Sequence, residues 1–94
     1  MAVNVVTIEE VKLYMLNAIR EAIDLDELVP NHKYELSEMV DMVYPGLWYN
    51  LRSVAGAPQL GKAFFAAVCR GQLSPLRFCG YASNHHKLYM IDDD

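Results

Sequence analysis

The chain has 94 residues, of which 53% are hydrophobic, and it carries one Trp, six Tyr and three Phe. This length and composition suit one small domain with an apolar core, spanning residues 1–94, and exclude a chain that is disordered throughout. The formal net charge of −4 argues against a protein that coats nucleic acid nonspecifically, because such binding depends on Lys and Arg displacing counterions from phosphates.

No membrane or export signal is evident. No apolar run approaches the roughly 20 residues that span a bilayer, and Met1–Asn4 lacks the basic region and apolar core of a secretory signal. We therefore expect a cytoplasmic protein without a membrane segment. We expect Cys69 and Cys79 to be free thiols, because a chain with this much apolar content needs no disulfide framework to fold.

Charge is unevenly distributed along the chain. Residues 1–44 hold nine acidic and three basic side chains, whereas residues 45–91 hold five basic side chains and no acidic one. The five are Arg52, Lys62, Arg70, Arg77 and Lys87. This split predicts a dipolar surface whose basic side could meet an anionic partner. Chance in a small sample is the alternative explanation.

The first predicted element is a helix. Thr7 and Glu10 have the spacing of a capping box, and seven apolar residues follow at three- and four-residue spacing. They are Ile8, Val11, Met15, Leu16, Ile19, Ala22 and Ile23. Because Asp24 and Glu27 would oppose the dipole of a longer helix, we expect a break near Ile23 and then a short helical turn capped by Asp24. Residues 1–6 and 92–94 are predicted to be frayed termini.

Two shorter helices are predicted next. Residues 32–36 have the pattern of a brief extended segment, and Ser37 is suited to cap a helix that carries Met39, Val40 and Val43. After the turn at residues 44–46, a further helical pattern covers residues 47–54. We expect Trp48 in the core because of its large apolar area; a stacking role at the surface is the alternative.

The helix predicted at residues 58–70 has an unusual outward face. Pro58 suits its first position, and Gly71 suits the residue after its end. Leu60, Ala63, Phe64, Ala67 and Val68 form the predicted inward face, and Lys62, Phe65, Ala66 and Cys69 the outward one. Either the domain itself covers this apolar outward face, or the face meets a partner.

The end of the chain predicts a β-hairpin. Residues 76–81 and 87–91 have the length and alternation of strands, and the five residues between them, 82–86, are polar or small. Together with Lys87 they make up the hairpin loop segment 82–87, where a binding function would lie. The fold class that follows is α+β, with a helical core of three or four helices and a C-terminal hairpin.

No pattern predicts catalysis, a metal or a cofactor. The sequence lacks an evident nucleophile with its base. A catalytic pair of Cys69 with His85 or His86 is the alternative, and it would make Cys69 react unusually fast with an alkylating reagent. Residues 56–62 end in Gly-Lys but lack the other residues of a phosphate-binding loop. The cysteines and histidines do not have the paired spacing of a zinc site. We expect a binding protein that is not an enzyme.

The order of the predicted elements resembles the winged helix-turn-helix superfamily. The resemblance is carried by residues 7–23, 34–43, 58–70, 76–81 and 87–91. Members of this superfamily bind DNA as dimers, bind RNA or serve as protein-docking modules. The resemblance therefore implies a binding protein, and we favour a regulatory protein that binds DNA, with a homodimer as one form. The third helix would enter the major groove and the hairpin would contact the backbone or minor groove. The residues that would make this contact are Arg52, Gln59, Lys62, Arg70, Arg77, Asn84, His85, His86 and Lys87.

The alternative function is a protein-interaction module. Residues 48–51, residues 60–65 and Val68 look like a pattern in short uncharacterised bacterial and phage proteins. On this hypothesis a phage or mobile-element protein binds a host protein through an acidic face, or through Phe65, Ala66 and Cys69, because buried aromatic anchors carry such interfaces better than scattered charges do.

Overall fold

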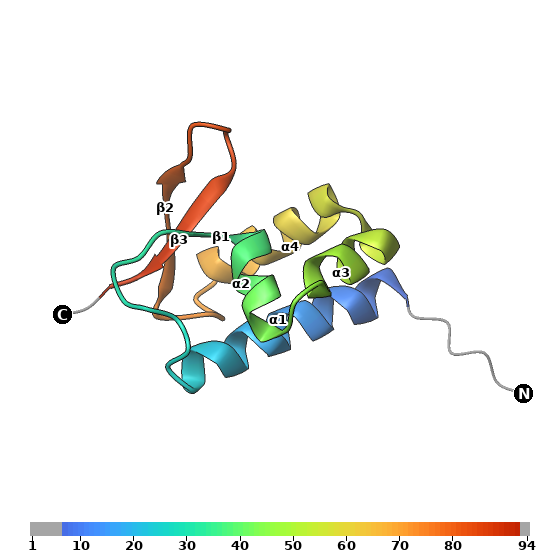
Figure 1. Cartoon of the computed structure of the whole chain (residues 1–94), viewed down its shortest axis with the longest axis horizontal. Coiled ribbons are helices and arrows are strands. Elements are labelled where there is room, and N and C mark those ends of the chain that lie inside the picture. Colours follow the sequence, from blue (N-terminus) through green and yellow to red (C-terminus); the bar gives the residue numbers. More distant parts are fainter. Residues whose placement is uncertain (1–6, 93–94) are drawn as a thin grey trace, which may run out of the picture.

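The computed structural model describes residues 7–92, which form four helices and a three-stranded antiparallel sheet (Figure 1). The helices are α1 (Ile8–Asp24), α2 (Leu36–Val43), α3 (Leu47–Ala55) and α4 (Ala57–Cys69), and the strands are β1 (Tyr34–Glu35), β2 (Leu76–Tyr81) and β3 (Lys87–Ile91). The predicted α+β class with a helical core and a C-terminal hairpin is confirmed. The predicted frayed ends lie outside the described residues, except for Asp92, which makes an ion pair with Arg77.

Helix α1 begins as the capping pattern predicts. The backbone N–H of Glu10 donates to the Thr7 hydroxyl at 3.1 Å. The helix ends at Asp24, as expected, but the short helical turn predicted after it is wrong. Asp24 accepts hydrogen bonds from Arg20 instead of capping a new helix. Asp26 then turns the chain with a φ of 57°, a left-handed conformation that interrupts helical geometry.

Helix α2 begins one residue before the predicted cap. Ser37 is not the N-cap; Glu35 is, and its backbone N–H donates to the Glu38 carboxylate at 3.0 Å. The reason is tertiary, because Tyr34 and Glu35 pair with Tyr89 and Leu88 of β3 and remain extended. Leu36 is therefore the first residue free to turn into a helix, and its side chain is buried.

Helices α3 and α4 follow each other with only Gly56 between them. Gly46 caps α3 and Gly56 separates the two helices with φ angles of 88° and 79°, which L side chains rarely adopt. The side chain of Asp41 in α2 accepts a hydrogen bond from the backbone N–H of Trp48 at 2.9 Å. Helix α2 thus satisfies a backbone donor that has no partner within the first turn of α3. Helix α4 starts one residue earlier than predicted, which makes Pro58 its second residue.

The sheet has the order β1-β3-β2, so the last strand in the chain lies in the middle. Phe78 lies opposite Tyr89, and a β-bulge follows at Cys79, after which Gly80 lies opposite Leu88. The bulge interrupts the simple alternation that the sequence predicts for residues 76–81 and leaves Cys79 half-buried.

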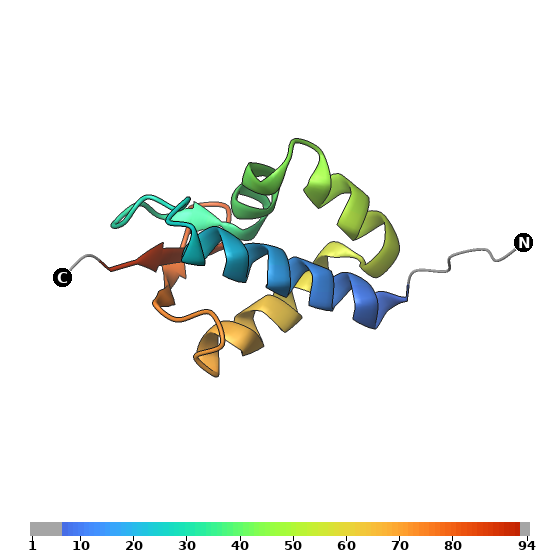
Figure 2. The same ribbon diagram turned by 90° about the horizontal axis from the view of Figure 1, so that it is seen from below.

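Helix α1 is the central helix, in contact with α2, α3 and α4 (Figure 2). Its Met15 and Ile19 are completely buried. Helix α4 packs on the sheet, where the Phe64 ring meets Tyr89 edge to face with 4.8 Å between centroids. Burial raises the pKa of the Tyr89 phenol, which keeps it neutral in the core. No helix within residues 7–92 has the length and hydropathy of a membrane span.

The buried contact between Phe64 and Tyr89 should contribute strongly to stability. We predict that Phe64→Ala lowers the free energy of unfolding by about 3–5 kcal/mol, because it removes a completely buried ring and leaves a cavity. Urea denaturation followed by circular dichroism measures this. Leu25→Ala, at a position 62% exposed, is the control and should cost less than about 0.5 kcal/mol. Equal effects of the two substitutions would contradict this account of the core.

Candidate functional site

The exposed side of α4 carries three of the predicted contact residues. Gln59, Lys62 and Arg70 are exposed and, with the half-buried Ala66 between them, follow one stripe of the helix at three- and four-residue spacing. We call these four residues the α4 face. Within residues 7–92, neither Lys62 nor Arg70 pairs with a carboxylate. Both charges are therefore available to a partner.

The apolar part of the outward side is covered in part by the domain itself. Phe65 is half-buried against Phe78 of β2, with 5.2 Å between ring centroids. The ammonium of Lys87 lies 5.1 Å from the centre of the Phe65 ring. Ala66 is half-buried and Cys69 is exposed. Because the hairpin packs on Phe65, the surface that α4 leaves exposed is more polar than its helical projection indicates.

The hairpin loop is ordered by its own hydrogen bonds. The N–H of Ala82 donates to the His86 carbonyl at 2.8 Å, and the N–H of His86 donates to the Asn84 side chain at 3.1 Å. His85 has a φ of 67° at the tip. The connection between the strands covers residues 82–86, as predicted, and Lys87, the last residue of the predicted binding segment 82–87, is the first residue of β3.

Acidic residues pair with two of the predicted basic positions. Arg77 donates from Nε to Asp92, and Nδ1 of His86 lies 2.5 Å from Oε1 of Glu35. The hydrogen bond and charge of each partner raise the pKa of Arg77 and lower the pKa of Asp92. The sequence signal missed both pairs because Glu35 and Asp92 lie outside residues 45–91, while the fold brings them next to that segment.

Four of the predicted residues line one open groove of about 450 Å³, which we call the hairpin groove. Arg52 comes from α3, Lys87 from β3, and His85 and His86 from the loop between the strands. The other lining residues are Glu35, Leu36, Ser37, Trp48, Ala57, Gly61 and Tyr89. Of the remaining predicted residues, Gln59, Lys62 and Arg70 lie on the α4 face, and Arg77 and Asn84 do not line the groove.

Trp48 belongs to this groove as well as to the core. It is half-buried and packs against the core cluster, so the prediction that the core holds it is only partly correct. Its neighbour Tyr49 is 65% exposed, and the Arg52 guanidinium lies 5.3 Å from the Tyr49 ring centre. Helix α3 therefore presents two aromatic rings and a guanidinium close together.

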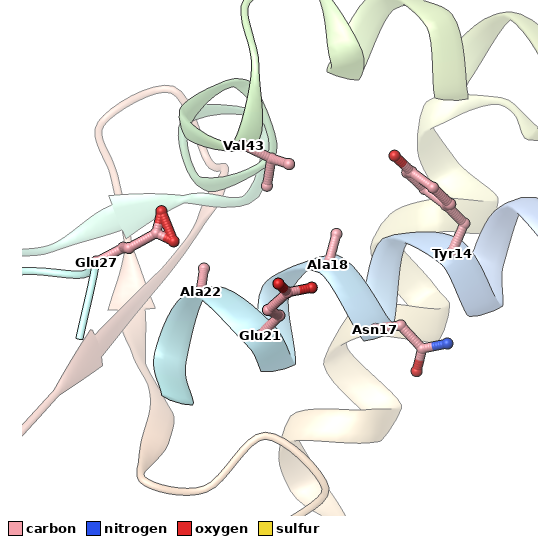
Figure 3. A pocket seen from close by; sticks show the side chains of 7 residues that line it. All are labelled: Tyr14, Asn17, Ala18, Glu21, Ala22, Glu27 and Val43. Atoms are coloured by element: carbon pink, nitrogen blue, oxygen red, sulfur yellow. The ribbon is translucent and has the colours of Figure 1, made fainter. Parts of the chain in front are cut away.

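A second groove, of about 370 Å³, lies between α1 and the end of α2. Figure 3 shows Val43 facing the side of α1 that carries Tyr14, Ala18 and Ala22. Asn17, Glu21 and Glu27 complete the lining of this acidic groove. The sequence does not predict this groove, because the apolar pattern of α2 suggests that Val43 is buried. In the structure Val43 is 37% exposed.

No match was found when the chain was compared with protein-family models, curated proteins and solved structures. Within residues 7–92, no three His, Cys, Asp or Glu side chains are grouped so that they could hold a metal ion.

The ion pair between Arg77 and Asp92 gives a testable titration. Arg77 stabilises the charged carboxylate, so its contribution to folding is present above the unfolded-state pKa of Asp92 and is lost as the pH falls through the lowered folded-state pKa. We predict that Arg77→Ala raises the pKa of Asp92 toward its usual range, as measured by carbon NMR of the carboxyl group. Arg70→Ala, which removes a charge that has no carboxylate partner within residues 7–92, should leave that pKa unchanged. An Asp92 that titrates identically in all three proteins would refute the pairing.

Proposed function

We propose that this protein binds duplex DNA as a non-catalytic regulator, through the α4 face and the hairpin loop. The observation that carries the proposal is the exposed stripe formed by Gln59 and Lys62 on the 13-residue helix α4 and by Arg70 at its C-cap. The major groove of DNA admits an α-helix of this kind.

The side chains on the α4 face suit the two tasks of DNA recognition. Arg70 and Gln59 have the donors and acceptors that read base edges, and the Lys62 ammonium can neutralise a phosphate. Phe65 lies to the side of this stripe, against the hairpin, so it does not place an apolar ring between the polar residues. The element order, which resembles a winged helix, places the hairpin directly after α4 and supports the same interface.

The charge layout limits the strength of such binding. Arg77 and His86 are next to Asp92 and Glu35, which leaves Arg52, Lys62, Arg70 and Lys87 as the bases of residues 45–91 without a carboxylate partner in residues 7–92. Four phosphate contacts correspond to a slope of log affinity against log salt of about −3.6 per protomer. A regulator with so small an electrostatic footprint depends on base contacts, or on a second protomer, for its affinity.

We predict that Lys62→Glu and Arg70→Glu each reduce duplex affinity at least about tenfold, because each replaces an attraction to phosphate or base by a repulsion. Fluorescence anisotropy with a labelled 24-base-pair duplex, selected from a random pool on the wild-type protein, measures this over a series of salt concentrations. The matched control is Lys33→Glu, an identical charge change at an exposed position outside the interface.

Two results would overturn the proposal. One is a salt response that is flat for the wild-type protein. The other is an equal loss of affinity in Lys33→Glu, which would show that total charge, and not the α4 face, controls binding. Circular dichroism of each variant separates loss of binding from loss of fold.

The acidic groove favours a second candidate function, which is docking of a protein segment with basic and apolar side chains. Two exposed apolar residues line the groove: Tyr14 is 49% and Val43 is 37% exposed. Met42 and Tyr44, the neighbours of Val43 in the chain, are 44% and 43% exposed. Glu21 and Glu27 add negative charge to the same groove. Apolar anchors supply affinity and complementary charges supply orientation at such surfaces. The structure favours this acidic face over the Phe65 side, which the hairpin partly covers.

If this docking occurs, we expect Tyr14→Ala to weaken nuclease-resistant recovery of the partner from a lysate at least about tenfold, because Tyr14 is an aromatic anchor of the groove. Leu13→Ala is the control, since Leu13 is 58% exposed and does not line the groove. Glu21→Lys should weaken recovery as well. Recovery that is unaffected by Tyr14→Ala would remove this candidate.

A further inference from the structure

We infer that the hairpin groove binds an unpaired nucleotide of a nucleic acid strand, with the base on Trp48 and the phosphate near Arg52 and Lys87. The inference rests on the proposed nucleic-acid function and extends it, because these residues lie beside the α4 face and not on it.

The groove has the size and shape for such a ligand. Its volume of about 450 Å³ lies within the range of about 300–1,000 Å³ that small-ligand sites occupy. It is open to solvent and not enclosed, so a nucleotide that remains part of a longer strand can enter it. Duplex DNA has its bases stacked inside, and only an unpaired base can insert.

The aromatic surface is already held in place. The half-buried Trp48 packs against the core and also lines the groove. Its backbone N–H donates a hydrogen bond to the Asp41 carboxylate. Stacking on such rings accepts any base, since every base has a π face, and this is how proteins bind single strands without reading sequence.

The positive charge comes from two different elements. Arg52 of α3 and Lys87 of β3 line the groove, and neither pairs with a carboxylate within residues 7–92. Glu35 is the one acidic residue of the lining, and its carboxylate is in contact with His86. Both cations lie beside aromatic rings, Arg52 by Tyr49 and Lys87 by Phe65. The groove therefore has two cations against one acid that already has a partner, which suits a phosphate diester.

Gly61 offers a way to close the groove without disturbing the helix. It lies within α4 and lines the groove, and a Cβ added there would meet no atom within 4 Å. A small side chain is therefore accommodated, whereas a large one would extend into the space that the nucleotide needs. Glycine is also the poorest helix former after proline, so substitution does not weaken α4 through propensity.

The experiment uses the fluorescence of Trp48, the only tryptophan in the chain. We expect a ten-nucleotide oligothymidylate to quench it to saturation at low salt, and a duplex of equal length to leave it nearly unchanged. Gly61→Leu should abolish the quenching, while Gly61→Ala, the matched control, should retain it. Arg52→Ala should weaken binding of the oligonucleotide about tenfold and reduce the slope of log affinity against log salt by about 1.

Four outcomes would overturn the inference. Three of them are fluorescence that the oligonucleotide does not change, a Gly61→Leu protein that folds and binds the strand like wild type, and equal quenching by the duplex. Saturation by thymidine monophosphate at the same nucleotide concentration would also overturn it, in favour of a site for free nucleotides. Lys62→Glu and Arg70→Glu separate the two interfaces. If these substitutions abolish duplex binding but the oligonucleotide does not quench the wild-type protein, only this inference fails. If the oligonucleotide quenches the wild-type protein but the duplex does not bind to it, only the proposed duplex function fails.

Discussion

The arrangement of the molecule depends on the packing of α4 against the C-terminal hairpin through the edge-to-face contact of Phe64 with Tyr89. Tyr89 lies on the central strand β3, which also pairs with β1, so this one contact joins the last helix to a sheet that begins near residue 34. Both rings are completely or almost completely buried. The aromatic contact between Phe65 and Phe78, with the Lys87 ammonium beside it, continues this interface to the surface.

This packing determines what α4 presents to solvent. Turning Phe64 inward and Phe65 sideways onto the hairpin leaves Gln59, Lys62 and Arg70 as the outward stripe. It also places the hairpin loop next to the start of α4 and to Arg52 of α3, which creates the hairpin groove. The two nucleic-acid surfaces that we propose are thus consequences of one helix–sheet interface. They share the hairpin loop, Arg52 and Lys87, whereas the α4 face belongs only to the duplex surface and Trp48 and Gly61 only to the hairpin groove.

Local signals predicted well where a few neighbouring residues decide the conformation. The cap of α1 by the Thr7 hydroxyl, the apolar stripe of α1 and Gly71 after α4 all correspond to features that the structure contains. Prediction was wrong where distant residues decide. Ser37 has the chemistry of a cap, but the pairing of Glu35 with Leu88 moves the start of α2. Similarly, no count of charges between residues 45 and 91 could show that Glu35 approaches His86.

The sequence by itself determined the helices, the hairpin and the residue types available on α4, because side-chain periodicity and capping act within a few residues along the chain. Only the tertiary structure decided which of those residues are free to bind. It covers part of Phe65, pairs Arg77 and His86 with acids, and gathers Arg52, Trp48 and Lys87 around one groove. The physical reason is that exposure, ion pairing and grooves are set by residues that lie far apart in the chain and become neighbours only when the sheet closes on α4.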